Sequence, residues 1–100
     1  MSWYIKTEVF NKKALNLSKR EKSKHIREHS KWLKNLKEIG LNITSGYLIN
    51  KEKVPGGGGL LALETDSYED AHKIIKTDPM IKNKLVSWEL HEWVEINTDN

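Results

Sequence analysis

A long helical segment lies between two strand-like segments of this chain, and that order limits the possible folds more than any other feature. Ser18 is a plausible N-cap, because Glu21 follows three residues later and completes a capping box. Gly40 stands where a helix commonly ends in a left-handed residue. The sequence therefore predicts one helix from Ser18 to about Ile39. Its apolar stripe consists of Ile26, His29, Leu33 and Leu36, with Trp32 beside it.

The rest of the chain predicts four strands and a second helix within one domain, for which 100 residues are enough. Asp66 or Ser67 can cap the second helix, which runs to Thr77 and is limited by Pro79. The strand-like segments are residues 3–10, 41–49, 60–65 and about 85–96. The order β-α-β-β-α-β predicts an α+β ferredoxin-like sandwich, with both helices on one face of a four-stranded antiparallel sheet. We expect an ordered core of about residues 2–96.

The second face of such a sheet would carry large apolar side chains. Trp3 beside Tyr4, and Trp88 near Trp93, place aromatic rings on both faces of the first and last strands. Residues 60–65 form a nearly continuous apolar run, which predicts burial on both faces. Because an exposed apolar face calls for a partner, we predict a homodimer that packs sheet against sheet.

Residues 50–59 contain Pro55 and four consecutive glycines, and they predict a flexible hairpin connection. Gly56–Gly59 lacks the G-x-x-x-x-G-K-[ST] pattern of a phosphate-binding loop and joins two strands. If these glycines serve a function, we expect a mobile lid or a close approach of the backbone to a ligand. The step Ser45–Gly46 near the end of the second strand similarly indicates a point where another group comes close to the backbone.

Charge is distributed unevenly along the chain, although the net charge is only +3. Residues 11–37 hold ten Lys and Arg but two acids, whereas residues 61–100 hold four Lys and nine acids. The basic segment predicts a solvated helix face, and the alternative is a surface for an anionic ligand or nucleic acid. That surface would consist of Lys12, Lys13, Lys19, Arg20, Lys22 and Lys24. The four Trp are not clustered like the base-stacking residues of RNA-binding domains, so we favour packing over nucleic-acid binding.

Cysteine is absent from the sequence, which excludes disulfides, thiolate catalysis and Cys-based metal sites and fits a reducing compartment. No apolar run approaches the roughly 20 residues of a membrane span. The first residues lack the basic-then-apolar order of a signal peptide. We therefore expect a cytoplasmic protein that does not bind to membranes.

Asp78 is a carboxylate in an apolar position. Tyr68, Ala71, Ile75 and Asp78 follow one another at helical spacing, so the acid continues a buried stripe. A buried carboxylate needs a partner, since desolvating it alone costs several kcal/mol. His29 occupies a similar stripe on the first helix, and both helices cover the same sheet face. The sequence thus predicts a His29–Asp78 pair, in which the acid orients the imidazole for proton exchange.

Each member of this pair also has a simpler interpretation. His29 can be a core histidine that donates to a backbone carbonyl, and Asp78 before Pro79 can cap a turn over residues 80–82.

His25 lies four residues before His29, which would place two metal ligands on one helix face. The HExxH motif is absent, however, and no third ligand stands out. We predict no metal site.

The segment His29–Gly40, the Ser45–Gly46 step and the run Gly59–Met80 together resemble the YCII-related (YciI-like) family of dimeric α/β-barrel proteins. The resemblance covers nearly the whole chain as a single domain, residues 1–100. It implies a ferredoxin-like protomer, a dimer formed through the sheets, and an active site built from a His and an Asp, which are His29 and Asp78 here.

This chain departs from the family pattern at two positions near the expected site. Ile26 stands where Arg is common, and Tyr47 follows Ser45–Gly46 where Pro is common. These differences affect the substrate class that the resemblance implies more than they affect the His29–Asp78 pair.

We therefore predict an enzyme without a cofactor that acts on a small aromatic or anionic molecule through lyase, isomerase or hydrolase chemistry. His29 would be the general acid/base, and Asp78 would orient it. The residues expected to shape its pocket are Ser45, Gly46, Gly58 and Gly59. The alternative is a non-catalytic module that binds a small molecule, and a weaker one is a nucleic-acid binder that uses the basic segment.

Overall fold

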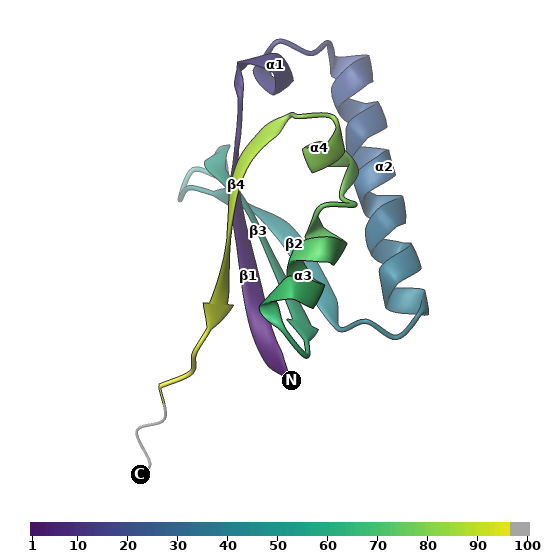
Figure 1. The fold of residues 1–100 in the computed structure, drawn as a ribbon. Helices are drawn as coiled ribbons and strands as arrows, with labels where there is room; N and C mark the ends of the chain where they lie inside the picture. The colour runs from purple at the N-terminus through teal and green to yellow at the C-terminus, as the bar shows by residue number, and fades with distance from the viewer. Residues whose placement is uncertain (97–100) are drawn as a thin grey trace.

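A computed structural model describes residues 1–96, and this range contains four helices and one four-stranded sheet (Figure 1). The elements are β1 (Ser2–Phe10), α1 (Lys12–Leu15), α2 (Lys19–Glu38), β2 (Ile43–Ile49), β3 (Pro55–Thr65), α3 (Tyr68–Ile75), α4 (Pro79–Lys82) and β4 (Val86–Trp93). In the described residues, no helix has the length and apolar content needed to cross a membrane.

The sheet has the strand order β2-β3-β1-β4, and each neighbouring pair is antiparallel. Helices α2 and α3 lie on one face of this sheet, and α4 lies beside α2 (Figure 1). The predicted ferredoxin-like βαββαβ fold is therefore confirmed, with α1 and α4 as additional short helices.

Helix α2 has the predicted ends. The Ser18 hydroxyl accepts a hydrogen bond from the Glu21 N–H, and the Glu21 carboxylate accepts one from the Ser18 N–H. Gly40 follows the C-cap with a φ of 95°. The predicted stripe was wrong at Ile26, which is 61% exposed. Viewed along the helix axis, the face that packs on the sheet is centred between His29 and Trp32. Ile26 lies about 60° from His29 on the side opposite to Trp32, so it falls outside that face.

The core fills the space between the sheet and the helices. Its buried members are Tyr4, Ile43, Leu61, Leu63, Ala71, Ile75 and Leu90. In β3 the buried residues alternate, so Leu61 and Leu63 face the helices while Leu60 is 39% exposed on the outer face. The prediction that this strand is buried on both faces is therefore wrong for a single chain.

The glycine-rich segment belongs to β3, so the predicted loop over residues 50–59 was wrong. The turn covers only residues 50–54, and β3 begins at Pro55. A Cβ on Gly58 would lie 2.2 Å from the Glu8 carbonyl oxygen, and one on Gly57 would lie 2.8 Å from Leu48 Cβ. The glycines thus let β3 approach its two neighbouring strands closely.

Strand β4 is shorter than predicted. It ends at Trp93, and residues 94–96 continue outside the sheet with exposed side chains. Val94 and Ile96 fall within the predicted strand of about residues 85–96, but they lie beyond the last residue that pairs with β1.

Candidate active site

Asp78 lies at the junction between two helices, fully buried. It is the N-cap of α4, and its Oδ1 accepts a hydrogen bond from the Met80 N–H at 3.0 Å. Pro79 occupies the first helical position, where its missing N–H is no loss. The capping interpretation and the paired interpretation of Asp78 are thus compatible, because one oxygen can accept two donors.

His29 projects from the middle of α2 toward this carboxylate. Its Nδ1 lies 2.9 Å from Asp78 Oδ1, and its side chain is 19% exposed. The ring of Trp32 lies beside the imidazole, with ring centroids 5.5 Å apart. The Trp32 Nε1–H donates to Thr77 Oγ1 at 2.8 Å, so α2 is fastened to the residue that precedes Asp78. These contacts fix both the ring and its distance from the acid.

Lys6 is a member of the site that the sequence reasoning missed. It lies on β1 with 1% exposure, and its Nζ donates to Asp78 Oδ2 at 3.1 Å. The same ammonium group pairs with the Glu8 carboxylate. Strand alternation places Lys6 on the same face as Tyr4, and the structure shows that this face is the buried one. A lysine on a buried face requires an acidic partner.

The charge state of Asp78 follows from these neighbours. Burial raises the pKa of Asp78, but the hydrogen bond from His29 and the charge of Lys6 lower it by more, with help from the Met80 N–H. The pKa of the carboxyl group therefore lies below its ordinary value, and Asp78 is ionised at neutral pH.

Ser45 completes a row of side chains across the inner face of the sheet. Ser45 on β2 pairs with Leu61 on β3, and Lys6 on β1 pairs with the same residue. The Ser45 Oγ lies 3.2 Å from His29 Nε2. His29 is therefore held at both ring nitrogens, by Asp78 on one side and Ser45 on the other.

The predicted glycines have different places. Gly59 faces Glu8, and a Cβ there would lie 3.1 Å from Glu8 Cγ, so its small size leaves room for the Glu8 side chain. Gly46 pairs with Leu60 on the outer face, away from His29. Gly58 contacts the Glu8 backbone, not the imidazole. The structure thus brings Ser45 to the His29–Asp78 pair but not Gly46 or Gly58, and the binding roles of all four residues stay predictions.

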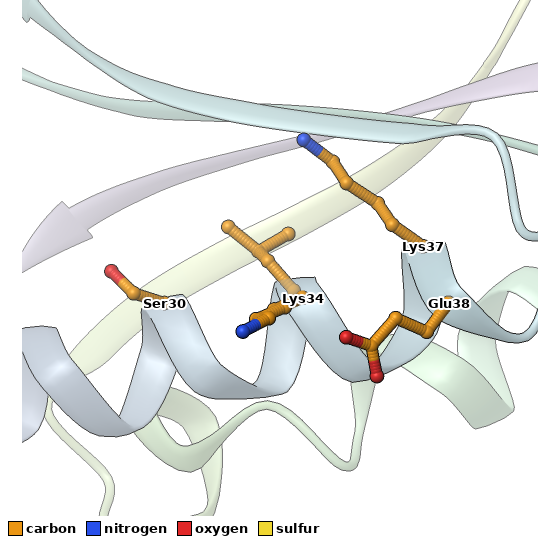
Figure 2. A pocket seen from close by; sticks show the side chains of 5 residues that line it. Ser30, Lys34, Lys37 and Glu38 are labelled. Carbon is orange, nitrogen blue, oxygen red and sulfur yellow. The ribbon is translucent and has the colours of Figure 1, made fainter.

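Two hollows lie near the site without containing His29, Asp78 or Ser45. The first, of about 450 Å³, lies along α2. Figure 2 shows four of its lining residues, Ser30, Lys34, Lys37 and Glu38, along the helix, with the Lys37 side chain extending toward the strands. The second, of about 380 Å³, is lined by residues of all four strands, among them the apolar residues Val9, Leu48 and Leu60.

The described residues contain no group of three His, Asp or Glu side chains that could hold a metal ion. His25 lies one turn before His29, and its Nδ1 is 3.7 Å from Glu28 Oε2.

No protein-family model and no curated protein matches the chain. Its fold is similar to that of 5-chloro-2-hydroxyhydroquinone dehydrochlorinase (TftG) from Burkholderia phenoliruptrix AC1100, solved with 2,5-dihydroxybenzoquinone, at a TM-score of 0.67 and 16% identity over 92% of this chain and 93% of that one. An ethyl tert-butyl ether D (EthD) family protein from Bacillus halodurans C-125 has a TM-score of 0.56 and 13% identity, with coverage of 94% and 100%. A protein from Arabidopsis thaliana has a TM-score of 0.57 and 8% identity over both full chains. The chain therefore shares the ferredoxin-like fold of these solved structures.

Proposed function

We propose that this protein is a YciI-like, cofactor-independent enzyme in which His29 moves a proton to or from a small molecule. The observation that carries the proposal is the 2.9 Å contact between His29 Nδ1 and the fully buried carboxylate of Asp78. A buried, ionised acid that orients a partly exposed imidazole is the arrangement that general acid/base catalysis needs.

The two ring nitrogens have separate tasks in this proposal. Asp78 accepts the Nδ1–H, which fixes the ring orientation and stabilises the imidazolium that forms during proton transfer. Nε2 faces Ser45 and exchanges the proton with the bound molecule. Lyase, isomerase and hydrolase reactions all require such a step.

Three observations support an aromatic or anionic substrate. The ring of Trp32 lies beside the imidazole and can stack on an aromatic molecule. Lys34 and Lys37 line the hollow along α2 and can attract an anion. TftG, which has a similar fold, acts on 5-chloro-2-hydroxyhydroquinone.

A thermal-shift screen of small phenols, quinones and carboxylates tests the proposal. Each compound that raises the melting temperature of the wild type is then incubated with the enzyme and followed by mass spectrometry. We expect His29→Ala to abolish turnover, whereas His91→Ala, which changes an exposed histidine on the outer sheet face, should retain it. Equal turnover by the wild type and His29→Ala would remove His29 as the acid/base.

The same screen separates the enzyme from a non-catalytic binding module. A compound that binds wild type and stays chemically unchanged would favour the binding module. Nucleic-acid binding, the weakest alternative, predicts a salt-dependent affinity for DNA or RNA that falls when the exposed basic residues at the start of α2 are neutralised. These are Lys19, Arg20, Lys22 and Lys24.

The outer sheet face supports a homodimer. Trp3 lies opposite Trp93 on this face, and Leu60 is exposed there. A second copy would cover both the aromatic pair and the hollow lined by Val9, Leu48 and Leu60. A single domain over residues 1–100, of which 97–100 lie outside the described range, and a cytoplasmic location also stay predictions.

A further inference from the structure

We propose that Ser45 is a nucleophile and that Ser45, His29 and Asp78 form a triad that transfers acyl groups from small esters. The inference deepens the proposed function, on which it rests, because it also uses His29 as the base. It names the reaction, acyl transfer through an ester of Ser45, and the substrate class, a small acyl ester.

The neighbours of Asp78 determine which nitrogen of the imidazole carries the proton. Asp78 Oδ2 accepts from the Lys6 ammonium at 3.1 Å, and Oδ1 accepts from the Met80 N–H at 3.0 Å. Both neighbours are donors, so the carboxylate is ionised and can only accept from the third neighbour, His29. The proton of the neutral imidazole is therefore on Nδ1.

This tautomer determines the role of the Ser45 hydroxyl. With its proton on Nδ1, the neutral ring has a lone pair on Nε2, and the Ser45 hydroxyl at 3.2 Å must donate to it. In the described part of the chain the Ser45 hydroxyl makes no other hydrogen bond, so the lone pairs of Oγ are available for attack. Ser45 lies on the edge strand β2 and is half-buried, which leaves it open to a ligand.

The arrangement meets the geometric conditions for an activated serine. Ser45, the nucleophile, lies within hydrogen-bond distance of His29, the base. His29 in turn lies within hydrogen-bond distance of the buried Asp78. The two partners contact different ring nitrogens, Ser45 at Nε2 and Asp78 at Nδ1. Such triads occur on unrelated folds and are recognised by geometry, not by chain order. The Ser45 hydroxyl is hydrogen-bonded to Nε2, the nitrogen through which His29 would exchange protons. It is therefore the group that His29 is placed to deprotonate.

The reaction balances without a co-reactant other than water. Ser45 Oγ forms a bond to the acyl carbon while its proton moves to His29 Nε2. The bond to the leaving oxygen then breaks, and the leaving alcohol takes that proton from Nε2. Water attacks the Ser45 ester with His29 again as the base, which releases the carboxylic acid and restores the serine.

The test uses the full chain with two probes, p-nitrophenyl acetate and a fluorophosphonate. We expect a burst of about one p-nitrophenolate per chain, and a fluorophosphonate adduct that peptide mapping places on Ser45. Ser45→Ala should lose both signals, and His29→Ala should slow both by about 10³-fold or more. Ser23→Ala, which changes an exposed serine on the same side of the sheet, should match the wild type.

Adduct mapping on the wild type tests whether Ser45 is the nucleophile even where a variant fails to fold. An adduct absent from Ser45, or ester hydrolysis unchanged in Ser45→Ala, would overturn the triad. The proposed function would survive that result if His29→Ala still abolished turnover of a compound from the screen. An adduct on Ser45 that forms equally fast in His29→Ala would also overturn the triad, because His29 would then not be the base that activates Ser45.

Discussion

Lys6 and Asp78 form an ion pair in the protein interior, with Nζ 3.1 Å from Oδ2 although 72 residues separate them along the chain. Both side chains are almost completely inaccessible to solvent. The pair joins the central strand β1 to the start of α4, and through Asp78 it also reaches His29 on α2. One carboxylate thus connects three elements of the fold, and the hydrogen bond from His29 together with the charge of Lys6 keeps that carboxylate ionised.

We predict that Lys6→Met lowers the free energy of unfolding by about 3 kcal/mol, because it leaves two carboxylates in the interior without their cation. Urea denaturation at pH 7 measures the change. Lys51→Met is the control, since Lys51 is exposed and lies 3.9 Å from an exposed Glu52, and it should change stability by less than about 0.5 kcal/mol. Equal effects of the two substitutions would show that the buried pair does not hold the fold together.

The lowered pKa of Asp78 predicts a specific dependence of stability on pH. Because the pKa is lower in the folded than in the unfolded chain, the ionised carboxylate stabilises the fold fully above its unfolded value of about 3.9. This contribution is lost as the pH falls through the folded value. Asp78→Asn should therefore lower the free energy of unfolding by about 2 kcal/mol at pH 7 and have a smaller effect at pH 2.

Urea denaturation at pH 7, 5, 3 and 2 provides the measurement. Asp66→Asn is the matched control, because Asp66 is an exposed carboxylate just before α3. This variant should follow the wild-type pH dependence. If Asp78→Asn lost as much stability on acidification as the wild type, the carboxylate could not be the group that titrates.

The sequence was sufficient to predict that His29 and Asp78 meet, because each stands on an apolar stripe and the element order puts both helices on one sheet face. Lys6 could not be placed in the same way. Both faces of β1 carry large apolar residues, so alternation alone does not say which face the helices cover. The partner of Lys6 also depends on where the chain turns after α3, which is set by packing.

The glycines were misassigned for a related reason. Four consecutive glycines have no side chains to show a strand period, so residues 56–59 resemble a loop in the sequence. In the structure the close approach of Glu8 and Leu48 excludes side chains from Gly58 and Gly57. The requirement for glycine at these positions comes from neighbouring strands in the folded chain. The local sequence pattern therefore does not reveal it.

Gly58→Ala is predicted to destabilise the fold by about 2 kcal/mol or more. The φ of Gly58 is 81°, and the new Cβ would lie 2.2 Å from the Glu8 carbonyl oxygen, so the strands must separate. Gly46→Ala is the control, because nothing lies within 4 Å of a Cβ at that position and its φ is ordinary. Thermal melting of the two variants makes the comparison, and similar melting temperatures would contradict the close approach.

The proposed homodimer predicts that a charge on the outer sheet face separates the two copies. Leu60→Glu places a carboxylate among Val9, Leu48 and the exposed strands, and it should raise the dimer dissociation constant by at least about tenfold, or 1.4 kcal/mol. Size-exclusion chromatography with light scattering over a range of concentrations reports the mass. Ile26→Glu is the control, because Ile26 is also an exposed apolar residue but lies on α2, away from that face.

Both positions are exposed in a single chain, so neither glutamate should unfold the protomer, and circular dichroism verifies this. The expected result is a dimer for the wild type and Ile26→Glu, and a monomer for Leu60→Glu at the same concentration. A monomeric wild type would refute the dimer outright. A dimer unaffected by Leu60→Glu but dissociated by Ile26→Glu would place the interface on the helical side, where it would cover α2, which contributes His29 to the site.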